Sequence, residues 1–279
     1  MMQQIEFSWK TKDGLNLYAK EWKPDGAVKA VVALVHGLGE HIGRYDHVAE
    51  AFGKEGFAMV GFDQRGHGKS DGIRGYETSY DTIMDDITQN IQNAKDRYPG
   101  LPVFLYGHSL GGNLVLYYGL TRKPELKGII ATSPGLATAE PLPPALMLMS
   151  KVMYRLAPSM KIKNGLALDG LSHDPEVAKK YIADSLVHPF ISPRLALDML
   201  NAGQYCIDHA AEFPLPLLLM QGTADRLVSP KKTKEFAAAA PLSKITYKEW
   251  SDHYHELHNE PDKAAVIATM VDWMNLELK

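Results

Sequence analysis

The best candidate in this chain for nucleophilic chemistry is a serine that lies between glycines. Ser109 is the centre of Gly107-His108-Ser109-Leu110-Gly111, which follows an apolar run and precedes a helical pattern. A serine on a sharp turn from strand to helix has a strained backbone, and the flanking glycines let neighbouring chain pass where a Cβ would clash. The pattern predicts an exposed nucleophile, with the Leu110 N–H beside it as one donor of an oxyanion hole.

A carboxylate and several histidines follow Ser109 in the order that this chemistry needs. A serine hydroxyl is a poor nucleophile until a base takes its proton, and the base needs a carboxylate to orient it. Asp225 lies in the loop after the penultimate apolar run, and His253, His255 and His258 follow the last one. All three histidines are candidates for the base, and we prefer His255.

The same histidines have a second interpretation as a metal site. The metalloprotease pattern is His-Glu-x-x-His, with both imidazoles on one face of a helix. Here His255-Glu256-Leu257-His258 is one residue short of that spacing. We therefore expect a site with no metal and no organic cofactor.

A second oxyanion donor is expected from the loop after the apolar run 30–35. That loop reads His36-Gly37-Leu38-Gly39-Glu40-His41. Its glycines allow the backbone to approach a ligand closely, so the Leu38 N–H is the natural donor. A simple glycine turn is the alternative interpretation.

Strand and helix patterns alternate along most of the chain. The alternation predicts an α/β fold with a mostly parallel, eight-stranded sheet flanked by helices. Active sites of such sheets lie at the carboxyl ends of the strands. The predicted strands cover residues 5–9, 15–22, 30–35, 57–62, 102–106, 128–132, 216–220 and 245–250, and the predicted helices cover 47–56, 80–98, 113–121, 231–240 and 261–278.

The region 134–213 interrupts the alternation with prolines and short helical patterns. We predict a helical cap, inserted before the last two strands, that divides the core into 1–133 and 214–279. Apolar residues share one broad helical face within it: Ala145, Leu146, Leu148, Met149, Val152, Met153 and Leu156. This stripe has three interpretations. It lines an acyl tunnel through Leu146, Met149 and Met153, it contacts a membrane or micelle surface, or it packs the cap onto the core.

Composition and charge exclude several classes of function. The 279 residues carry a formal net charge of −3 without a dense Lys/Arg block, which argues against a nucleic-acid partner. Cys206 is the only cysteine, so no internal disulfide is expected. The amino terminus has no signal-peptide pattern, and no stretch reaches the roughly 18 apolar residues of a spanning helix. We expect a soluble, cytoplasmic protein, and the sequence does not set its oligomeric state.

Together these motifs resemble the α/β-hydrolase superfamily and, within it, the monoacylglycerol lipase and lysophospholipase group. The resemblance covers nearly the whole chain apart from the predicted cap, in the segments HGLGEH with RY (36–41, 44–45), DQRGHGKS (63–70), GHSLGG (107–112), GTADRLV (222–228) and YHELHNE (254–260). It implies the α/β-hydrolase fold and a triad of Ser109, Asp225 and His255. It favours His255 because the base of such enzymes is the first histidine of a Tyr-His-x-Leu-His run.

The resemblance also implies a substrate and a place for it. Glu40, Arg44 and His258 are expected to form a polar pocket for the glycerol end, although an ion pair that braces the loop is an alternative for Glu40 and Arg44. The expected reaction is release of fatty acid from monoacylglycerols through an acyl-enzyme. A general carboxylesterase or lysophospholipase with the same triad is the main alternative, and a non-catalytic binding protein on the same fold is a remote one. The expected partner is a small amphipathic lipid or ester, with peripheral contact between the cap and a membrane or micelle.

Overall fold

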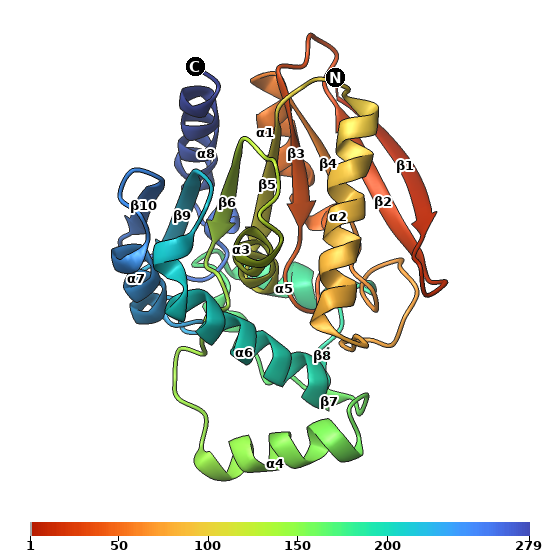
Figure 1. Cartoon of the computed structure of the whole chain (residues 1–279), viewed down its shortest axis with the longest axis vertical. Coiled ribbons are helices and arrows are strands. Elements are labelled where there is room, and N and C mark those ends of the chain that lie inside the picture. Colours follow the sequence, from red (N-terminus) through yellow and green to blue (C-terminus); the bar gives the residue numbers. More distant parts are fainter. Residues whose placement is uncertain (1) are drawn as a thin grey trace.

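An eight-stranded sheet forms the centre of the computed structural model, which describes residues 2–279 (Figure 1). The strand order is β1-β2-β4-β3-β5-β6-β9-β10; the β1–β2 and β2–β4 pairs are antiparallel and the other five pairs are parallel. The strands are β1 Gln3–Lys10, β2 Asn16–Lys23, β3 Ala30–Val35, β4 Phe57–Phe62, β5 Val103–His108, β6 Gly128–Thr132, β9 Leu217–Gly222 and β10 Ile245–Trp250. The predicted α/β class, the mostly parallel sheet and its eight strands are confirmed.

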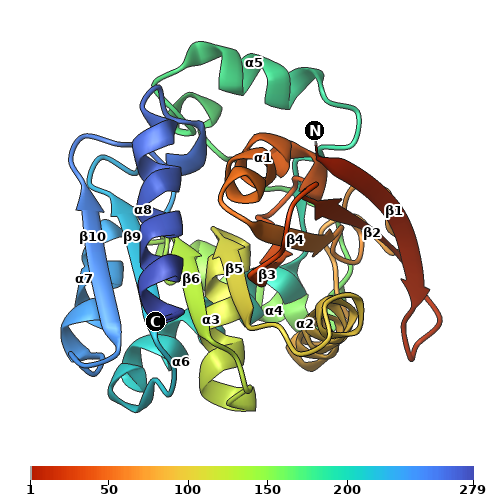
Figure 2. The same cartoon turned by 90° about the horizontal axis from the view of Figure 1, so that it is seen from above.

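Helices cover both faces of this sheet, which explains the continuous apolar runs in its central strands. In β3, Val32 and Leu34 pack in the cluster that contains α1 Asp46–Lys54 and α8 Lys263–Glu277. Val31, Ala33 and Val35 pack in the cluster on the opposite face. Helices lie on both sides of the sheet (Figure 2). That second face is covered by α2 Tyr80–Arg97, α3 Leu110–Arg122 and α7 Pro230–Ala239, and α6 Pro193–Asp208 packs against α3 in the same cluster.

The chain between β6 and β9 lies beyond the carboxyl ends of the parallel strands. It contains α4 Pro144–Leu156, β7 Ile162–Lys163, η2 Leu168–Gly170, α5 Pro175–Ala183, β8 Phe190–Ile191, α6 and η3 Ala210–Glu212. Helix α6 packs against α3, and α4 lies on the outer side of α6 (Figure 1). The two-residue strands β7 and β8 pair antiparallel and were not expected, because two residues are too few to show a periodic pattern. The division of the chain at 134 and 213 stays a prediction.

Two short 3-10 helices belong to the loops of the candidate site, η1 Ile42–Tyr45 after β3 and η4 Leu257–Asn259 after β10. Within residues 2–279, no helix has both the length and the apolar character to cross a lipid bilayer.

Candidate active site

Ser109 occupies a strained turn between β5 and α3. Its φ is 56° and its ψ is −117°, a conformation that is unusual for a residue with a side chain. A Cβ on Gly107 would lie 2.2 Å from the Gly111 carbonyl oxygen, and one on Gly111 would lie 2.0 Å from the Val35 carbonyl oxygen. Both positions therefore require glycine, and the tight turn leaves the Ser109 hydroxyl at the carboxyl end of β5.

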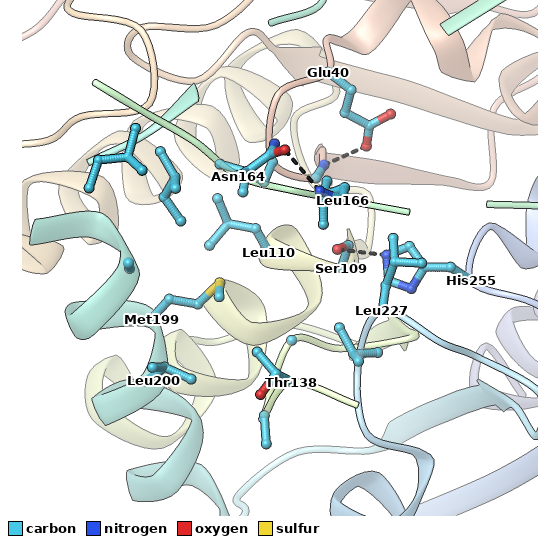
Figure 3. A pocket seen from close by; sticks show the side chains of 18 of the residues that line it. Glu40, Ser109, Leu110, Thr138, Asn164, Leu166, Met199, Leu200, Leu227 and His255 are labelled. Atoms are coloured by element: carbon cyan, nitrogen blue, oxygen red, sulfur yellow. Dashed lines mark hydrogen bonds between the residues drawn. The ribbon is translucent and has the colours of Figure 1, made fainter. Parts of the chain in front are cut away.

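The Ser109 hydroxyl meets one of the three candidate histidines. His255 Nε2 lies 2.8 Å from Ser109 Oγ (Figure 3). His255 Nδ1 lies 2.8 Å from Asp225 Oδ2. The carboxylate is itself held in place, because Oδ1 accepts the N–H groups of Leu227 and Val228 at 2.8 and 3.1 Å. The loops after β5, β9 and β10 thus bring serine, aspartate and histidine into one hydrogen-bonded chain.

Electrostatics in this chain favour a charged Asp225 and a basic His255. Burial alone would lower the pKa of His255, but the neighbouring Asp225 carboxylate outweighs it, and the pKa is raised above 6.5. Burial would raise the pKa of Asp225, but the attraction and hydrogen bond of His255 lower it below its ordinary value. The imidazole is therefore oriented and strengthened as a proton acceptor for the serine hydroxyl.

The other two candidate histidines, His253 and His258, contact groups other than Ser109. His253 Nδ1 contacts the Ser251 carbonyl at 2.8 Å and Nε2 contacts Asp262 at 2.8 Å. His258 is fully buried, with its ring stacked on Tyr45 at a centroid distance of 4.8 Å. In the part of the chain that the structure describes, no three His, Cys, Asp or Glu side chains are grouped as metal ligands.

A largely apolar cavity of about 260 Å³ opens beside Ser109 and His255 (Figure 3). The two residues expected to donate to an oxyanion, Leu38 and Leu110, line it, as do Glu40 and Arg44. Other parts of the wall come from the region between β6 and β9: Leu142, Leu146, Leu166, Leu171, Met199 and Leu200. The arrangement places the Ser109 hydroxyl beside a space suited to a hydrocarbon chain.

Glu40 and Arg44 form an ion pair that joins two loops of the site. Arg44 contacts Glu40 Oε2 at 2.5 Å and makes two hydrogen bonds of 2.8 Å to Glu256, the neighbour of His255. Glu40 Oε1 accepts the Gly37 N–H at 2.6 Å. The structure therefore contains the ion pair expected to brace the loop, and Glu40 and Arg44 also line the cavity. His258 lies outside the cavity wall, so the structure does not join it to them in a pocket.

Two of the three cap residues expected to contact an acyl chain lie outside the wall of this cavity. Leu146 lines the cavity, but Met149 and Met153 are not in its wall. Met149 is 52% exposed, and no residue of α4 is buried, because only one side of this helix faces α6. Met149 and Met153 do not line this cavity, so their contact with an acyl chain stays a prediction, and packing onto the core does not explain the stripe.

Several residues of the site were not expected from the sequence. Glu256 completes the ion pair of Arg44, and its position beside His255 was the only available signal. Asn164 lines the cavity and accepts the Leu166 N–H at 3.2 Å (Figure 3). Ser133 donates its hydroxyl to the His255 carbonyl at 2.7 Å. Neither of the last two lies in a motif.

Comparison with known proteins gives a consistent set of relatives. Residues 26–262 match the family described as "Serine aminopeptidase, S33". A monoacylglycerol lipase of Mycolicibacterium smegmatis is 32% identical over 270 residues, which are 96% of this chain and 96% of that protein. Phospholipase YtpA of Bacillus subtilis is 34% identical over 247 residues, 88% of this chain and 94% of that protein. The crystal structure of a Paleococcus ferrophilus monoacylglycerol lipase has a TM-score of 0.83 at 32% identity and covers 99% of both chains.

Proposed function

The chain belongs to the family described as serine aminopeptidase, S33, and from this premise we propose that it is a monoacylglycerol hydrolase with Ser109 as its nucleophile. It is a carboxylic ester hydrolase of the α/β-hydrolase superfamily, in the monoacylglycerol lipase group. The observation that carries the proposal is the apolar cavity that opens beside the Ser109–His255 hydrogen bond. A hydrocarbon wall favours a fatty acyl chain over the polar backbone of a peptide.

The proposed reaction proceeds in two steps. His255, oriented by Asp225, takes the Ser109 proton as Oγ attacks the ester carbonyl carbon, and the N–H groups of Leu38 and Leu110 stabilise the oxyanion. The imidazolium then gives its proton to the leaving glycerol oxygen, so that an acyl-enzyme and free glycerol are formed. In the second step His255 takes a proton from water, which attacks the acyl carbonyl carbon, and the imidazolium returns that proton to Ser109 Oγ as the fatty acid is released.

Lysophospholipid hydrolysis is the second candidate function. It is favoured by the 34% identity to a protein named as a phospholipase. A lysophospholipid has the same single acyl ester but carries a charged headgroup. The two functions differ in what must fit beside Arg44 and Glu40, which are already engaged with each other at the cavity wall.

The proposal includes contact between α4 and a membrane or micelle surface. Large apolar side chains of α4 are exposed, with Leu148 at 66% and Leu156 at 77%. Residues 141–168 contain four cations and no Asp or Glu: Lys151, Arg155, Lys161 and Lys163. An exposed apolar patch with a basic rim is typical of a surface that binds lipid. Leu148→Ser with Leu156→Ser should weaken sedimentation with lipid vesicles, whereas Leu242→Ser, at an 88% exposed position outside α4, should not.

The main test compares hydrolysis of monoacylglycerols of increasing chain length with lysophosphatidylcholine and short p-nitrophenyl esters. We expect the highest kcat/KM for medium or long monoacylglycerols. Ser109→Ala should lower kcat by about a millionfold, with little further loss when His255 is also changed. Activity confined to short soluble esters would reduce the function to a general esterase. A Ser109→Ala variant that keeps a tenth of the activity would exclude Ser109 as the nucleophile.

A further inference from the structure

Asn164 and Gly165 form the only Asn-Gly pair in the sequence. They follow β7 directly, in the loop that leads to η2, and Asn164 lines the cavity beside Ser109 (Figure 3). Gly165 is exposed, and a Cβ on it would have no atom within 4 Å beyond its chain neighbours. The pair therefore connects an open stretch of backbone to the wall of the cavity.

An asparagine is chemically labile when the backbone nitrogen of the next residue attacks its side-chain carbonyl carbon, Cγ. The attack closes a five-membered succinimide ring. A side chain on the next residue crowds this ring, and glycine has none. An exposed Asn-Gly pair is thus the sequence in which this attack meets the least steric hindrance.

The hydrogen bonds around Asn164 leave both reacting nitrogens free. Among residues 2–279, no group accepts a hydrogen bond from the Gly165 N–H, which is the attacking nitrogen. Nδ2 of Asn164, the leaving group, is buried and has no hydrogen-bond partner in the same part of the chain. Oδ1 accepts the Leu166 N–H at 3.2 Å (Figure 3). That donor stabilises the negative charge that develops on Oδ1 during the attack.

Asn201 provides a contrast within the same chain. It is also exposed and is followed by a small residue, Ala202. However, it lies inside helix α6, where regular hydrogen bonding occupies the N–H of the next residue. The attacking nitrogen is therefore held by the helix at Asn201 and is free at Asn164.

We propose that Asn164 is a site of spontaneous deamidation, which replaces an amide in the cavity wall by a carboxylate and lowers activity as the protein ages. Hydroxide removes the Gly165 N–H proton, and this nitrogen forms a bond to Asn164 Cγ. The Cγ–Nδ2 bond then breaks, and Nδ2 takes up a proton and leaves as ammonia. Water opens the ring at one of its two carbonyl carbons, which leaves aspartate or isoaspartate at position 164.

Both products alter the wall of the cavity. In aspartate, a charged oxygen takes the buried place of Nδ2, where no donor meets it, and burying an unpaired charge is unfavourable. Isoaspartate adds a backbone carbon ahead of Leu166, which lines the same cavity. We expect kcat/KM for monoacylglycerols to fall by between about fivefold and about a hundredfold. This consequence for activity rests on the proposed function, whereas the modification itself does not.

The modification is tested on the wild-type protein by incubation at neutral and at mildly alkaline pH, followed by trypsin digestion and mass spectrometry. The peptides 164–179 and 162–179 contain Asn164 as their only amide side chain, and peptide 195–226 contains Asn201. The mass difference between an amide and a carboxylate should accumulate in the first two peptides, faster at the higher pH, and not in the third. A fresh sample digested in parallel corrects for modification during digestion. Equal modification of Asn164 and Asn201 would overturn the assignment.

The consequence for activity is tested with two variants and a matched control, each compared with its own fresh activity. Asn164→Gln keeps an amide but would have to close a larger ring, so its activity should persist while that of the wild type falls in proportion to the modified fraction. Fresh Asn164→Asp should match fully modified wild type, and Asn201→Gln should decay as the wild type does. Thermal unfolding shows whether each variant is folded.

Modified wild-type protein that keeps its full kcat/KM would overturn the effect on activity, as would Asn164→Gln that decays as fast as the wild type. A fresh wild-type protein that hydrolyses no ester would contradict the proposed function instead. The masses of the peptides would still decide whether Asn164 is modified.

Discussion

Ser133 has the second strained backbone conformation of the site, with φ at 43°. Its hydroxyl donates to the His255 carbonyl at 2.7 Å, and the adjacent Thr132 carbonyl accepts the Ser109 N–H at 3.0 Å. The turn after β6 thus holds the backbones of both Ser109 and His255. A side chain at positive φ costs energy, so the observed contacts must compensate for it.

Ser133→Ala should therefore lower kcat by more than the loss of unfolding free energy alone would explain. The His255 carbonyl would lose its buried donor, at a cost of about 1–3 kcal/mol in unfolding free energy. We expect kcat to fall because the base is less well positioned, while KM changes little. Ser70→Ala is the matched control, since the Ser70 hydroxyl is also buried and donates to a backbone carbonyl, that of Asp63, at 2.5 Å. Equal kcat in the two variants would show that Ser133 is only structural.

The pH dependence of kcat/KM tests the charge state of His255. Because the Asp225 carboxylate raises its pKa above 6.5, the imidazole accepts the Ser109 proton only above that raised value. Activity should thus be present at higher pH and be lost as the pH falls through the pKa of His255. Asp225→Asn should lower this midpoint and reduce kcat by about ten-thousandfold. A wild-type acid limb centred below 6 would contradict the assignment.

At the scale of single residues, steric rules were more predictive than chemical ones. The turn at Ser109 was predictable because glycines at 107 and 111 leave no room for a Cβ. The sequence order alone kept three histidines as candidates for the base. The burial of His258 against Tyr45 depends on packing between η1 and η4, which are far apart in the chain, so no local pattern could indicate it.

Among elements, the loops at the carboxyl ends of the strands are tied to each other by the ion pair of Arg44. Glu40 belongs to the loop after β3, and Glu256 belongs to the loop after β10. The Arg44 side chain is 11% exposed and both carboxylates are 3% exposed. Burial would raise the pKa of Glu256, but the charge and hydrogen bonds of Arg44 keep it well below its usual range.

Arg44→Met should lower the unfolding free energy by about 3–5 kcal/mol, because it leaves two carboxylates buried without their cation. Chemical denaturation at pH 7 would measure this. Arg226→Met is the control: Arg226 is 48% exposed, it pairs with a 75% exposed Asp169, and such a surface pair contributes at most about 1 kcal/mol. If the two variants were equally stable, the buried pair would not brace the site.

Local sequence patterns also determined which helices and strands could be predicted accurately. Strands with continuous apolar runs were found, since these reflect burial on both faces. Helix α3 was expected over 113–121 but begins at Leu110, because Gly111 and Gly112 resemble a helix breaker. Both are required instead by close packing, Gly111 against the Val35 carbonyl and Gly112 against Pro134.

In the whole molecule, the region between β6 and β9 is joined to both loops of the site. The His188 N–H donates to the Gly39 carbonyl at 2.9 Å, and His41 Nε2 lies 2.8 Å from Asp184. On the other side, the Glu256 N–H donates to the Leu171 carbonyl at 2.7 Å. These contacts are made mainly through backbone groups, which explains why the sequence predicted the insertion but not how it docks.

The buried His258 makes the stability of the folded protein depend on pH. His258 is fully buried, and neither of its ring nitrogens has a hydrogen-bond partner in the described part of the chain. Burial, together with the neighbouring His108, lowers its pKa well below 6.5 in the folded protein. As the pH falls below about 6.5, the unfolded chain takes up a proton that the folded chain does not. Its contribution to stability is therefore complete above that pH and is lost as the pH falls toward the folded-state pKa.

His258→Phe should remove this acid sensitivity, because a phenyl ring can stack on Tyr45 without titrating. Between pH 7 and 5, the unfolding free energy of the wild type should fall more steeply than that of the variant, by up to about 1.4 kcal/mol per pH unit. Urea unfolding at several pH values would measure the difference. His209→Gln, at a half-buried histidine of α6's carboxyl end, is the control for removing a histidine elsewhere in the fold. Parallel pH curves for His258→Phe and wild type would mean that His258 does not titrate on unfolding. A large rise in KM for monoacylglycerols in His258→Phe would indicate that this residue belongs to the glycerol pocket that the family resemblance implied.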